Sequence, residues 1–397
     1  MNPRATIMKQ NLTSRLVTVV IATALTTVVC MARESVPPDV AAKIASAVQK
    51  ELEAGLFPGA VVLVGTRDKV LYHEAFGFAQ VIPRKVPMQK DSIFDVASIT
   101  KVVCTATAVG ICKDRGLVDP DASMTKYLPD HQGKGVEKID LRRLASHTSG
   151  FAENPRVSDG GKLKGDAIFA QMLKDDPRWP VNTHYEYACR NIIYLSTIVE
   201  RVTGQSFGEF CHDNIFKPLE MTDSAFNRIE PSARVVATGY PVLGENHAAD
   251  GRDAGRAIGN AGLFTTASDL SHFAEMLLGQ GTWHGRRILS AETVADFTKL
   301  NQLPQFPGRG FIWEIDSKSN HRPTSMSVTA YGHSGSMGIS LWIDPQKKVY
   351  TLVMTNRTHA PKEPLSRPRV IEQYKARGRI ADAALEALAT LFETGGK

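Results

Sequence analysis

A serine and a lysine three residues apart, Ser98 and Lys101, form the pattern in this sequence that could do chemistry most directly. They open an apolar run that is typical of a buried helix, and residues three apart on a helix lie on one face, about 5–6 Å apart at Cβ. The amine of Lys101 could therefore reach the hydroxyl of Ser98. Ser98 would also stand at the positive end of the helix, beside backbone N–H groups that have no partner within it.

The pattern is short, and chance also produces it. Serine is a preferred N-cap residue, so Ser98 could simply cap the helix that Lys101 continues. A catalytic assignment therefore needs further residues: a group that transfers a proton, donors that stabilise an oxyanion, and a polar wall that orients the substrate. Two stretches of the chain offer such residues.

The first stretch runs from Tyr185 to Asn191 and stands directly before a predicted helix. A tyrosine at such a junction can face a site. A cationic Lys101 beside it would lower the pKa of the Tyr187 phenol, which would make the phenol a usable base. The alternative is that both tyrosines of this stretch only pack against their neighbours.

The second stretch runs from Tyr331 to Gly338, reads Y-G-H-S-G-S-M-G, and leads into a predicted strand. Glycine allows two backbones to approach closely, so an N–H group in this stretch could complete an oxyanion hole. The alternative is an ordinary glycine-rich edge of a sheet.

The elements that must position these residues follow from the spacing of apolar residues and from turn signals. Strands near both termini and helices between them predict an α+β fold: one antiparallel sheet built from both termini, flanked by helices, with an inserted, mostly helical domain. The predicted helices cover residues 39–56, 98–116, 141–150, 191–204, 267–278 and 380–392, and the predicted strands cover residues 59–65, 70–78, 338–343 and 349–355.

Two domains are expected from this order of elements. The sheet domain would comprise residues 33–95 and 256–397, and the helical domain residues 96–255, with the active site between them. Residues 228–260 lack periodicity and are expected to form a long loop over the site or an insertion.

Composition excludes several classes of function. The chain is 43% hydrophobic and 22% charged, as in ordinary globular proteins. Residues 1–32 carry three basic residues and no acid, so without them the net charge of +6 becomes +3, and no basic patch interleaved with aromatic residues is present. Nucleic acid is therefore not expected as a partner. Beyond Cys30, the four cysteines have no C-x-x-C or zinc spacing, so Cys104 and Cys112 are expected to be buried rather than bridged.

The first 32 residues have the pattern of a secretory signal peptide. Basic residues precede an uncharged apolar run from Leu16 to Ala32, which ends in an A-x-A-like sequence. The protein is therefore expected to be secreted or periplasmic. An uncleaved membrane anchor and a lipoprotein modified at Cys30 are the alternatives.

The chain resembles the serine β-lactamase and penicillin-binding-protein family, in particular its class C β-lactamase and family VIII carboxylesterase branch. The S-x-x-K pattern belongs to penicillin-recognising enzymes. The similarity extends over about residues 38–395, with all segments in the family's order. The segments that carry it are Phe94–Val103, Leu144–Gly150, Gly259–Leu270 and Gly332–Gly338 with the following Trp342–Pro345.

The resemblance implies a role for each candidate residue and no cofactor or metal. Ser98 would be the acylated nucleophile, Lys101 would help to deprotonate it, and Tyr187 would transfer the proton and activate the hydrolytic water. The N–H groups of Ser98 and Ser336 would form the oxyanion hole. Substrate would be bound by Cys189 and by the stretch His333, Ser334 and Gly335.

Two departures from the family pattern bear on the substrate. The second motif is commonly Y-x-N, but Cys189 stands where the asparagine would be, and a thiol cannot donate and accept as an amide does. The third motif is commonly K-T-G, but here it begins with His333, which is mostly neutral at pH 7. A β-lactam carboxylate should therefore be held weakly. Small esters, amides or β-lactams and a peptidoglycan peptide remain the candidate substrates, with esters favoured.

Two other functions compete with this hypothesis. A metal hydrolase could use His247, Asp250 and Asp253, although the chain has no H-E-x-x-H. A penicillin sensor or peptidoglycan-binding module with little or no turnover would share the fold and the serine. An α/β-hydrolase is disfavoured because no serine stands in G-x-S-x-G.

Overall fold

A seven-stranded antiparallel sheet in the order β3-β2-β1-β12-β11-β10-β9 forms the centre of the chain. The computed structural model describes residues 36–393 except 155, 228, 240–242, 302, 316–320 and 362–364, so the predicted signal peptide lies outside the described residues. The strands are β1 (Gly59–Thr66), β2 (Val70–Gln80), β3 (Val86–Pro87), β9 (Glu314–Ile315), β10 (Tyr331–Gly335), β11 (Ile339–Asp344) and β12 (Val349–Thr355).

The middle of this sheet is apolar on both faces. In β1, Val61 and Leu63 join the core on one face, and Val62 and Val64 join the core on the other, because successive side chains of a strand point to opposite faces. The near-continuous apolar run of β1 is therefore the signature of a strand covered on both sides.

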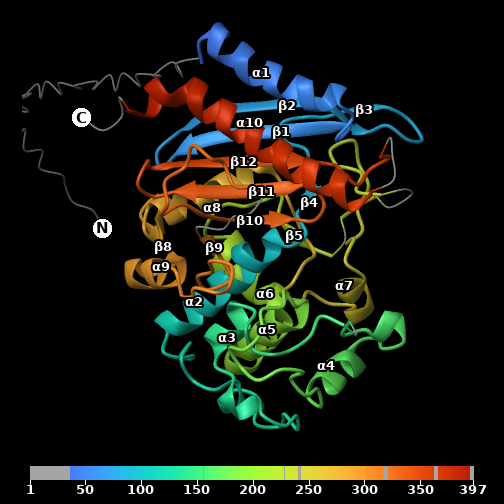
Figure 1. Ribbon diagram of the computed structural model, residues 1–397, viewed down its shortest axis with the longest axis vertical. Helices are drawn as coiled ribbons and strands as arrows, with labels where there is room; N and C mark the ends of the chain where they lie inside the picture. The colour runs from blue at the N-terminus through green and yellow to red at the C-terminus, as the bar shows by residue number, and fades with distance from the viewer. Residues whose placement is uncertain are drawn as a thin grey trace, which may run out of the picture. The chain divides into compact units, whose positions relative to one another are not determined.

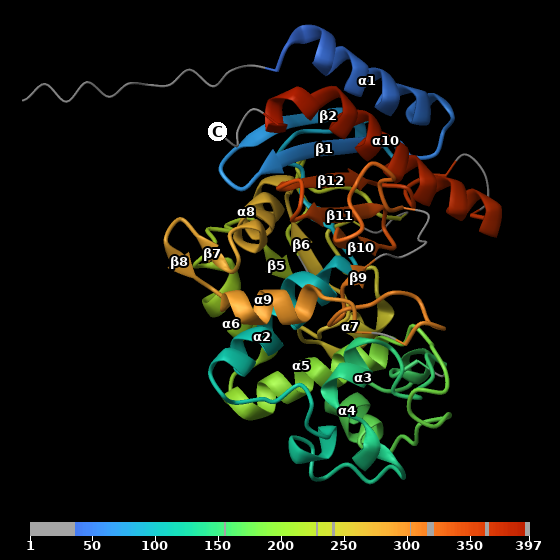
Figure 2. The same ribbon diagram turned by 60° about the vertical axis from the view of Figure 1, so that its left-hand side comes forward.

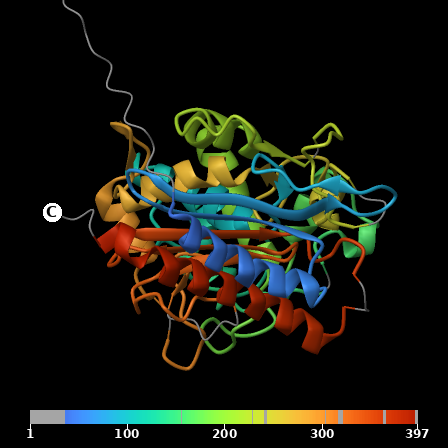
Figure 3. The same cartoon turned by 90° about the horizontal axis from the view of Figure 1, so that it is seen from above.

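Helices cover each face of the sheet. On one face α1 (Pro38–Glu53) and α10 (Arg367–Glu393) lie side by side, as Figures 1 and 3 show, and enclose a core that includes Ile44, Val48 and Ile380. On the other face α8 (Ala267–Leu278) packs on β1 and β12. Within the described ranges, no helix is long and apolar enough to cross a membrane.

The remaining elements lie beyond α8, on the side of the sheet opposite α1 and α10 (Figure 2). A three-stranded sheet in the order β4-β6-β5 links this part to the main sheet. Its strands are β4 (Phe94–Asp95), β5 (Ala225–Phe226) and β6 (Leu263–Thr265), and a hairpin is formed by β7 (Thr282–Trp283) and β8 (Arg286–Arg287). The α-helices are α2 (Thr107–Asp114), α3 (Leu141–Ala145), α4 (Asp166–Met172), α5 (Cys189–Thr203), α6 (Phe207–Cys211), α7 (Ala249–Ala254) and α9 (Ala291–Thr298).

The predicted α+β fold with its sheet built from both termini is confirmed. The helix after Ser98 differs in detail, because it begins as the π-helix η1 (Lys101–Ala106) before it continues as α2. The last helix, α10, begins thirteen residues before the predicted start at residue 380. The stretch predicted as a long loop contains the short helix α7.

Candidate active site

A strained turn after β4 presents Ser98. Ala97 has φ of +46°, a conformation that residues other than glycine seldom adopt. The buried carboxylate of Asp95 holds the turn, since it accepts the N–H of Ala97 at 2.8 Å and the N–H of His247 at 2.8 Å. Burial raises the pKa of Asp95 to about 6. Sequence reasoning did not identify Asp95, although it is part of the Phe94–Val103 segment.

Lys101 lies fully buried against the nucleophile candidate. Its Nζ donates to Ser98 Oγ at 2.9 Å and to the carbonyl oxygen of Asn260 at 2.7 Å, and Cys189 Sγ lies 3.6 Å away. An ammonium has three hydrogens, and these three acceptors use all of them. When Lys101 loses a proton, its amine can accept the hydroxyl proton of Ser98 instead of donating to it.

Tyr187 lies beside both residues, as the sequence predicted. The Nζ of Lys101 is 5.2 Å from the centre of the Tyr187 ring. The expected pKa shift is wrong, however: burial raises the pKa of the phenol more than the charge of Lys101 lowers it. The pKa of Lys101 is also raised, because the neighbouring Cys189, Tyr187 and Glu153 outweigh the effect of burial. At neutral pH the pair therefore holds both protons.

His147 fixes the segment that carries Tyr187. Its carbonyl oxygen accepts the N–H of Glu186 at 3.1 Å, its Nδ1 accepts the N–H of Ala188 at 3.3 Å, and its ring centre lies 4.5 Å from that of Tyr187. Burial, followed by the charges of Arg309 and Lys101, holds its pKa well below the usual range, so the ring is neutral.

The third-motif stretch lies directly against the turn of Ser98. A Cβ on Gly335 would come within 2.2 Å of the carbonyl oxygen of Val96, so only glycine fits at this position. Ser336 follows at the end of β10. Within the described part of the chain, neither the N–H of Ser98 nor that of Ser336 donates a hydrogen bond. Two free donors on adjacent turns are what an oxyanion hole requires.

His333 carries no charge at this site. Burial lowers its pKa to about 3, with further repulsion from Arg309 and Lys101. Its Nδ1 donates to the carbonyl oxygen of Ser334 at 2.9 Å, since a carbonyl can only accept, and Nε2 is then an acceptor. The family usually has a lysine at this position. His333 is neutral, so it does not supply the positive charge of that lysine.

A cation does lie nearby, on Arg309, which the sequence prediction missed. This buried guanidinium lies 5.6 Å from the centre of the Tyr187 ring, donates to the Tyr185 hydroxyl at 3.2 Å and lies 3.5 Å from Glu314. Burial raises the pKa of Glu314, but His321 and Arg309 together lower it by more, so the carboxylate is ionised. Arg309 is therefore largely neutralised within the protein.

Cys189 borders the site as predicted. Its backbone N–H donates to Glu153 Oε2 at 2.5 Å at the start of α5. Burial raises the pKa of its thiol, although Lys101 opposes this, so the group is mainly a neutral thiol. Cys104 and Cys112 are buried and unbridged, as expected from the sequence.

The sequence contains a second serine with a lysine three residues later, Ser123 and Lys126. The contacts of this pair differ from those of Ser98 and Lys101. Ser123 Oγ caps a single 3₁₀ turn by accepting the N–H of Thr125 at 3.3 Å. Lys126 Nζ lies over the ring of Tyr127, 5.5 Å from its centre. The spacing alone therefore does not identify a nucleophile.

The residues considered for a metal hydrolase have other partners. The backbone N–H of His247 donates to Asp95, Asp250 accepts the hydroxyl of Ser158 at 2.9 Å, and Asp253 pairs with Lys164. In the ranges that the structure describes, no three His, Cys, Asp or Glu side chains are grouped to hold a metal ion.

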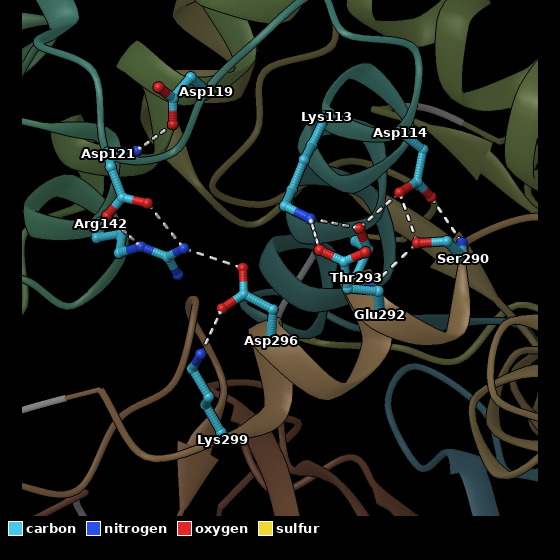
Figure 4. Close-up of polar contacts among 10 residues, drawn as sticks. All are labelled: Lys113, Asp114, Asp119, Asp121, Arg142, Ser290, Glu292, Thr293, Asp296 and Lys299. Carbon is cyan, nitrogen blue, oxygen red and sulfur yellow. Dashed lines mark hydrogen bonds and ion pairs between the residues drawn. The ribbon is translucent and has the colours of Figure 1, made fainter.

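Two cavities lie away from Ser98. One of about 1130 Å³ is at the opposite end of the sheet, between the turns at residues 66–69 and 345–348. One of about 440 Å³ lies between α2, α3 and α9, where each charged side chain faces one of opposite charge (Figure 4). Arg142, for example, donates to Asp121 at 2.8 Å and to Asp296 at 2.9 Å. This network holds α9 against α2 and so supports the helix that follows Lys101.

The protonation state of the Lys101–Tyr187 pair predicts the pH dependence of the reaction. Both pKa values are raised above their ordinary values near 10, and catalysis needs one proton removed from the pair. Ester hydrolysis should therefore increase from pH 6 to pH 9 without a plateau, by up to about tenfold per pH unit. Initial rates in buffers of constant ionic strength measure this. A flat profile from mildly acidic to alkaline pH would exclude this pair as the base.

The sheet, the adjoining helical part and the serine, lysine and tyrosine at their junction define the class of proteins with the β-lactamase and penicillin-binding-protein fold. The profile of the family described as Beta-lactamase matches residues 44–376, so the chain belongs to this family of serine hydrolases. The resemblance stated from the sequence motifs is thereby confirmed.

The individual relatives and solved structures described next share 25% or less of their residues with this chain. A protein of Escherichia coli O157:H7 named "Putative D-alanyl-D-alanine carboxypeptidase" is 25% identical over 370 residues, which cover 82% of this chain and 84% of that protein. A penicillin-binding-protein homologue from Caulobacter crescentus has a TM-score of 0.69 at 21% identity, covering 89% of this chain and 99% of its own. A family VIII carboxylesterase has a TM-score of 0.66 at 20% identity, and the match covers 87% of this chain and 98% of the carboxylesterase.

Proposed function

We propose that the chain cleaves ester or amide bonds of small acyl substrates through an acyl-enzyme on Ser98. The observation that carries this proposal is the 2.9 Å contact between Lys101 Nζ and Ser98 Oγ inside a buried, polar setting. An isolated N-cap serine would not need a fully buried lysine as its partner, because burying an ammonium is costly unless its hydrogen bonds are made.

The proposed reaction assigns a step to each group. Ser98 Oγ attacks the substrate carbonyl carbon while its proton passes to the deprotonated Lys101–Tyr187 pair. The carbonyl oxygen becomes an oxyanion and accepts the N–H groups of Ser98 and Ser336. Tyr187 gives the proton to the leaving alcohol or amine as the C–O or C–N bond breaks. Water then attacks the carbonyl carbon of the acyl-enzyme and gives a proton to the same pair, which passes it to Ser98 Oγ as the bond between Oγ and the acyl carbon breaks and the acid is released.

For the substrate we propose neutral esters in preference to β-lactams. His333 is uncharged, and Arg309 is already paired with Glu314 at 3.5 Å, so no free cation of the described residues is positioned for a substrate carboxylate. Cys189 cannot replace the amide that usually contacts a β-lactam side chain. The N-terminal sequence supports export, so we further propose that the protein acts outside the cytoplasm.

A substrate panel tests this proposal. The kcat/KM for short p-nitrophenyl esters should exceed that for a chromogenic cephalosporin and for a D-Ala-D-Ala peptide. His333→Lys should raise the cephalosporin-to-ester ratio by at least about tenfold, because a charge-assisted hydrogen bond to the carboxylate contributes about 1.5–3 kcal/mol. The exposed residue His212 provides the matched control, and His212→Lys should leave the ratio unchanged. A parent enzyme that prefers the cephalosporin would contradict the substrate assignment.

Intact-mass spectrometry separates the enzyme from a sensor. An enzyme should show an adduct on Ser98 that disappears as substrate is consumed. An adduct with penicillin that persists for hours, together with no ester turnover, would instead support a sensor with little or no turnover.

A further inference from the structure

The turn that carries the oxyanion donor Ser336 is bounded by two glycines. Gly335 ends β10, and Gly338, which has φ of +120°, directly precedes β11. The N–H of Gly338 donates to the carbonyl oxygen of Gly335 at 3.0 Å, which closes the turn. Glycine restricts the backbone dihedrals least, so this hydrogen bond alone does not fix the orientation of the exposed Ser336. An N–H group that must meet a developing oxyanion needs further restraint, because its contribution depends on preorganisation.

The segment at the end of β12 supplies this restraint. The Nε of Arg357 donates to the carbonyl oxygen of Ser336 at 2.7 Å. Two residues earlier, the N–H and the hydroxyl of Thr355 both donate to the carbonyl oxygen of Gly338, at 3.0 and 2.8 Å. Only the dihedrals φ and ψ separate the N–H of a residue from its own carbonyl group. Holding the carbonyl of Ser336 therefore also limits where its N–H can point.

Arg357 is itself held in place from α10. It is 7% exposed, and its Nη1 donates to Oε1 of Gln373 at 2.8 Å. Gln373 is 1% exposed, and its Nε2 donates to the carbonyl oxygen of Leu56 at 2.7 Å. Tyr374, the next residue of α10, has its ring centre 5.3 Å from the guanidinium and accepts a hydrogen bond from it. The orientation of Arg357 is therefore set by residues of α10 on one side and by Ser336 on the other.

We propose that Arg357 and Gln373 are positioning residues, which hold the N–H of Ser336 where the oxyanion forms. The inference rests on the proposed function, because it takes this N–H as a donor to the oxyanion. Arg357 acts through the carbonyl group of Ser336, and Gln373 acts through Arg357. A guanidinium suits this task, because its donors have fixed directions and bind both partners at the same time. α10, which covers the face of the main sheet opposite the helical part, thereby contributes to the active site.

Steady-state kinetics of ester hydrolysis test the role of Arg357. Arg357→Met should lower kcat by about 10- to 100-fold and change KM by less than about twofold, because a misplaced oxyanion donor is lost in the transition state and not in the bound substrate. The Ki of phenylboronic acid, whose tetrahedral adduct on Ser98 uses the same donors, should rise in proportion to the loss of kcat/KM. The shape of the pH profile should stay that of the parent, because the variant leaves the Lys101–Tyr187 pair unchanged.

Two variants of Gln373 separate positioning from stability. Gln373→Met removes the acceptor of Arg357 Nη1, so it should lower kcat by about three- to tenfold at an unchanged KM. Gln373→Glu keeps an oxygen for Arg357 but loses the donor to the carbonyl of Leu56, so it should lower the Tm and keep kcat within about twofold of the parent. Arg357→Met combined with Gln373→Met should lose no more kcat than Arg357→Met alone, because Gln373 acts through Arg357.

Arg369 provides the matched control. It also lies on α10 and donates to the carbonyl oxygen of Gly55 at 2.6 Å, one residue before the carbonyl that Gln373 binds. Arg369→Met should keep the kcat and the Ki of the parent, even where it lowers the Tm. If Arg357→Met does not fold, the comparison of Gln373→Met with Gln373→Glu decides.

The outcomes distinguish this inference from the proposed function. Ester hydrolysis that requires Ser98 but keeps its kcat and its Ki in Arg357→Met and Gln373→Met would overturn the inference alone. An equal loss of kcat in Gln373→Glu or Arg369→Met would also overturn it, because the loss would then follow stability. A parent protein without hydrolysis that depends on Ser98 would overturn the proposed function, and the inference with it.

Discussion

Ser98→Ala should abolish labelling by a fluorophosphonate and lower the kcat for ester hydrolysis by at least about 10⁴-fold, since it removes the hydroxyl oxygen that lies 2.9 Å from Lys101 Nζ. The fold should remain, because the Oγ of Ser98 contacts Lys101 and contributes little to the core. Circular dichroism and intact-mass spectrometry measure the two effects separately.

Ser123→Ala is the matched control for this experiment. Ser123 has a lysine at the same spacing, but its hydroxyl caps a surface turn. This variant should keep full labelling and lose about 1 kcal/mol of stability, which is typical of a lost N-cap. Stoichiometric labelling of Ser98→Ala would place the nucleophile elsewhere and remove the basis of the proposed reaction.

Lys101→Met should reduce the acylation rate by at least about 10³-fold, because it removes the amine that accepts the Ser98 proton while it keeps the length of the side chain. Lys101 is fully buried, so an apolar side chain at this position should not unfold the protein, and thermal unfolding of the variant and the parent checks this directly. Stopped-flow measurement of the burst with a p-nitrophenyl ester gives the acylation rate.

The control for Lys101 is again the second pair. Lys126→Met removes a lysine whose Nζ lies over the Tyr127 ring at the surface, and the acylation rate should not change. If Lys101→Met acylates at the parent rate, Tyr187 alone would have to serve as the base, and the pH profile of that variant would then report a single group.

Much of the fold follows from local patterns in the sequence. The apolar run of β1, the turn between β1 and β2 and the amphipathic stripe of α1 depend on residues that are close in sequence, so they could be predicted to within a few residues. The π-helix at Lys101 could not, because it depends on how the buried helix packs rather than on any residue type.

The residues of the site that belong to a sequence motif could be predicted. The residues that reach the site through contacts between distant parts of the sequence could not. Ser98, Lys101 and Tyr187 are brought together as expected. Arg309 stands between two glycines in a stretch without periodicity, and its contact with Tyr185 spans 124 residues, so nothing local indicates its role. The raised pKa of Tyr187 was missed for a related reason: the degree of burial is a property of the whole fold.

The central strand pair has a consequence for how this chain folds. β1 pairs with β12, and the N–H of Gly59 donates to Asn356 Oδ1 across 297 residues of sequence. Such contacts form late, because the entropy of closing so long a loop must be overcome before the pairing stabilises anything. The main sheet therefore cannot close until almost the entire chain has left the ribosome, and a chain truncated before β12 would expose one edge of β1, together with part of the sheet face that α10 covers, to aggregation.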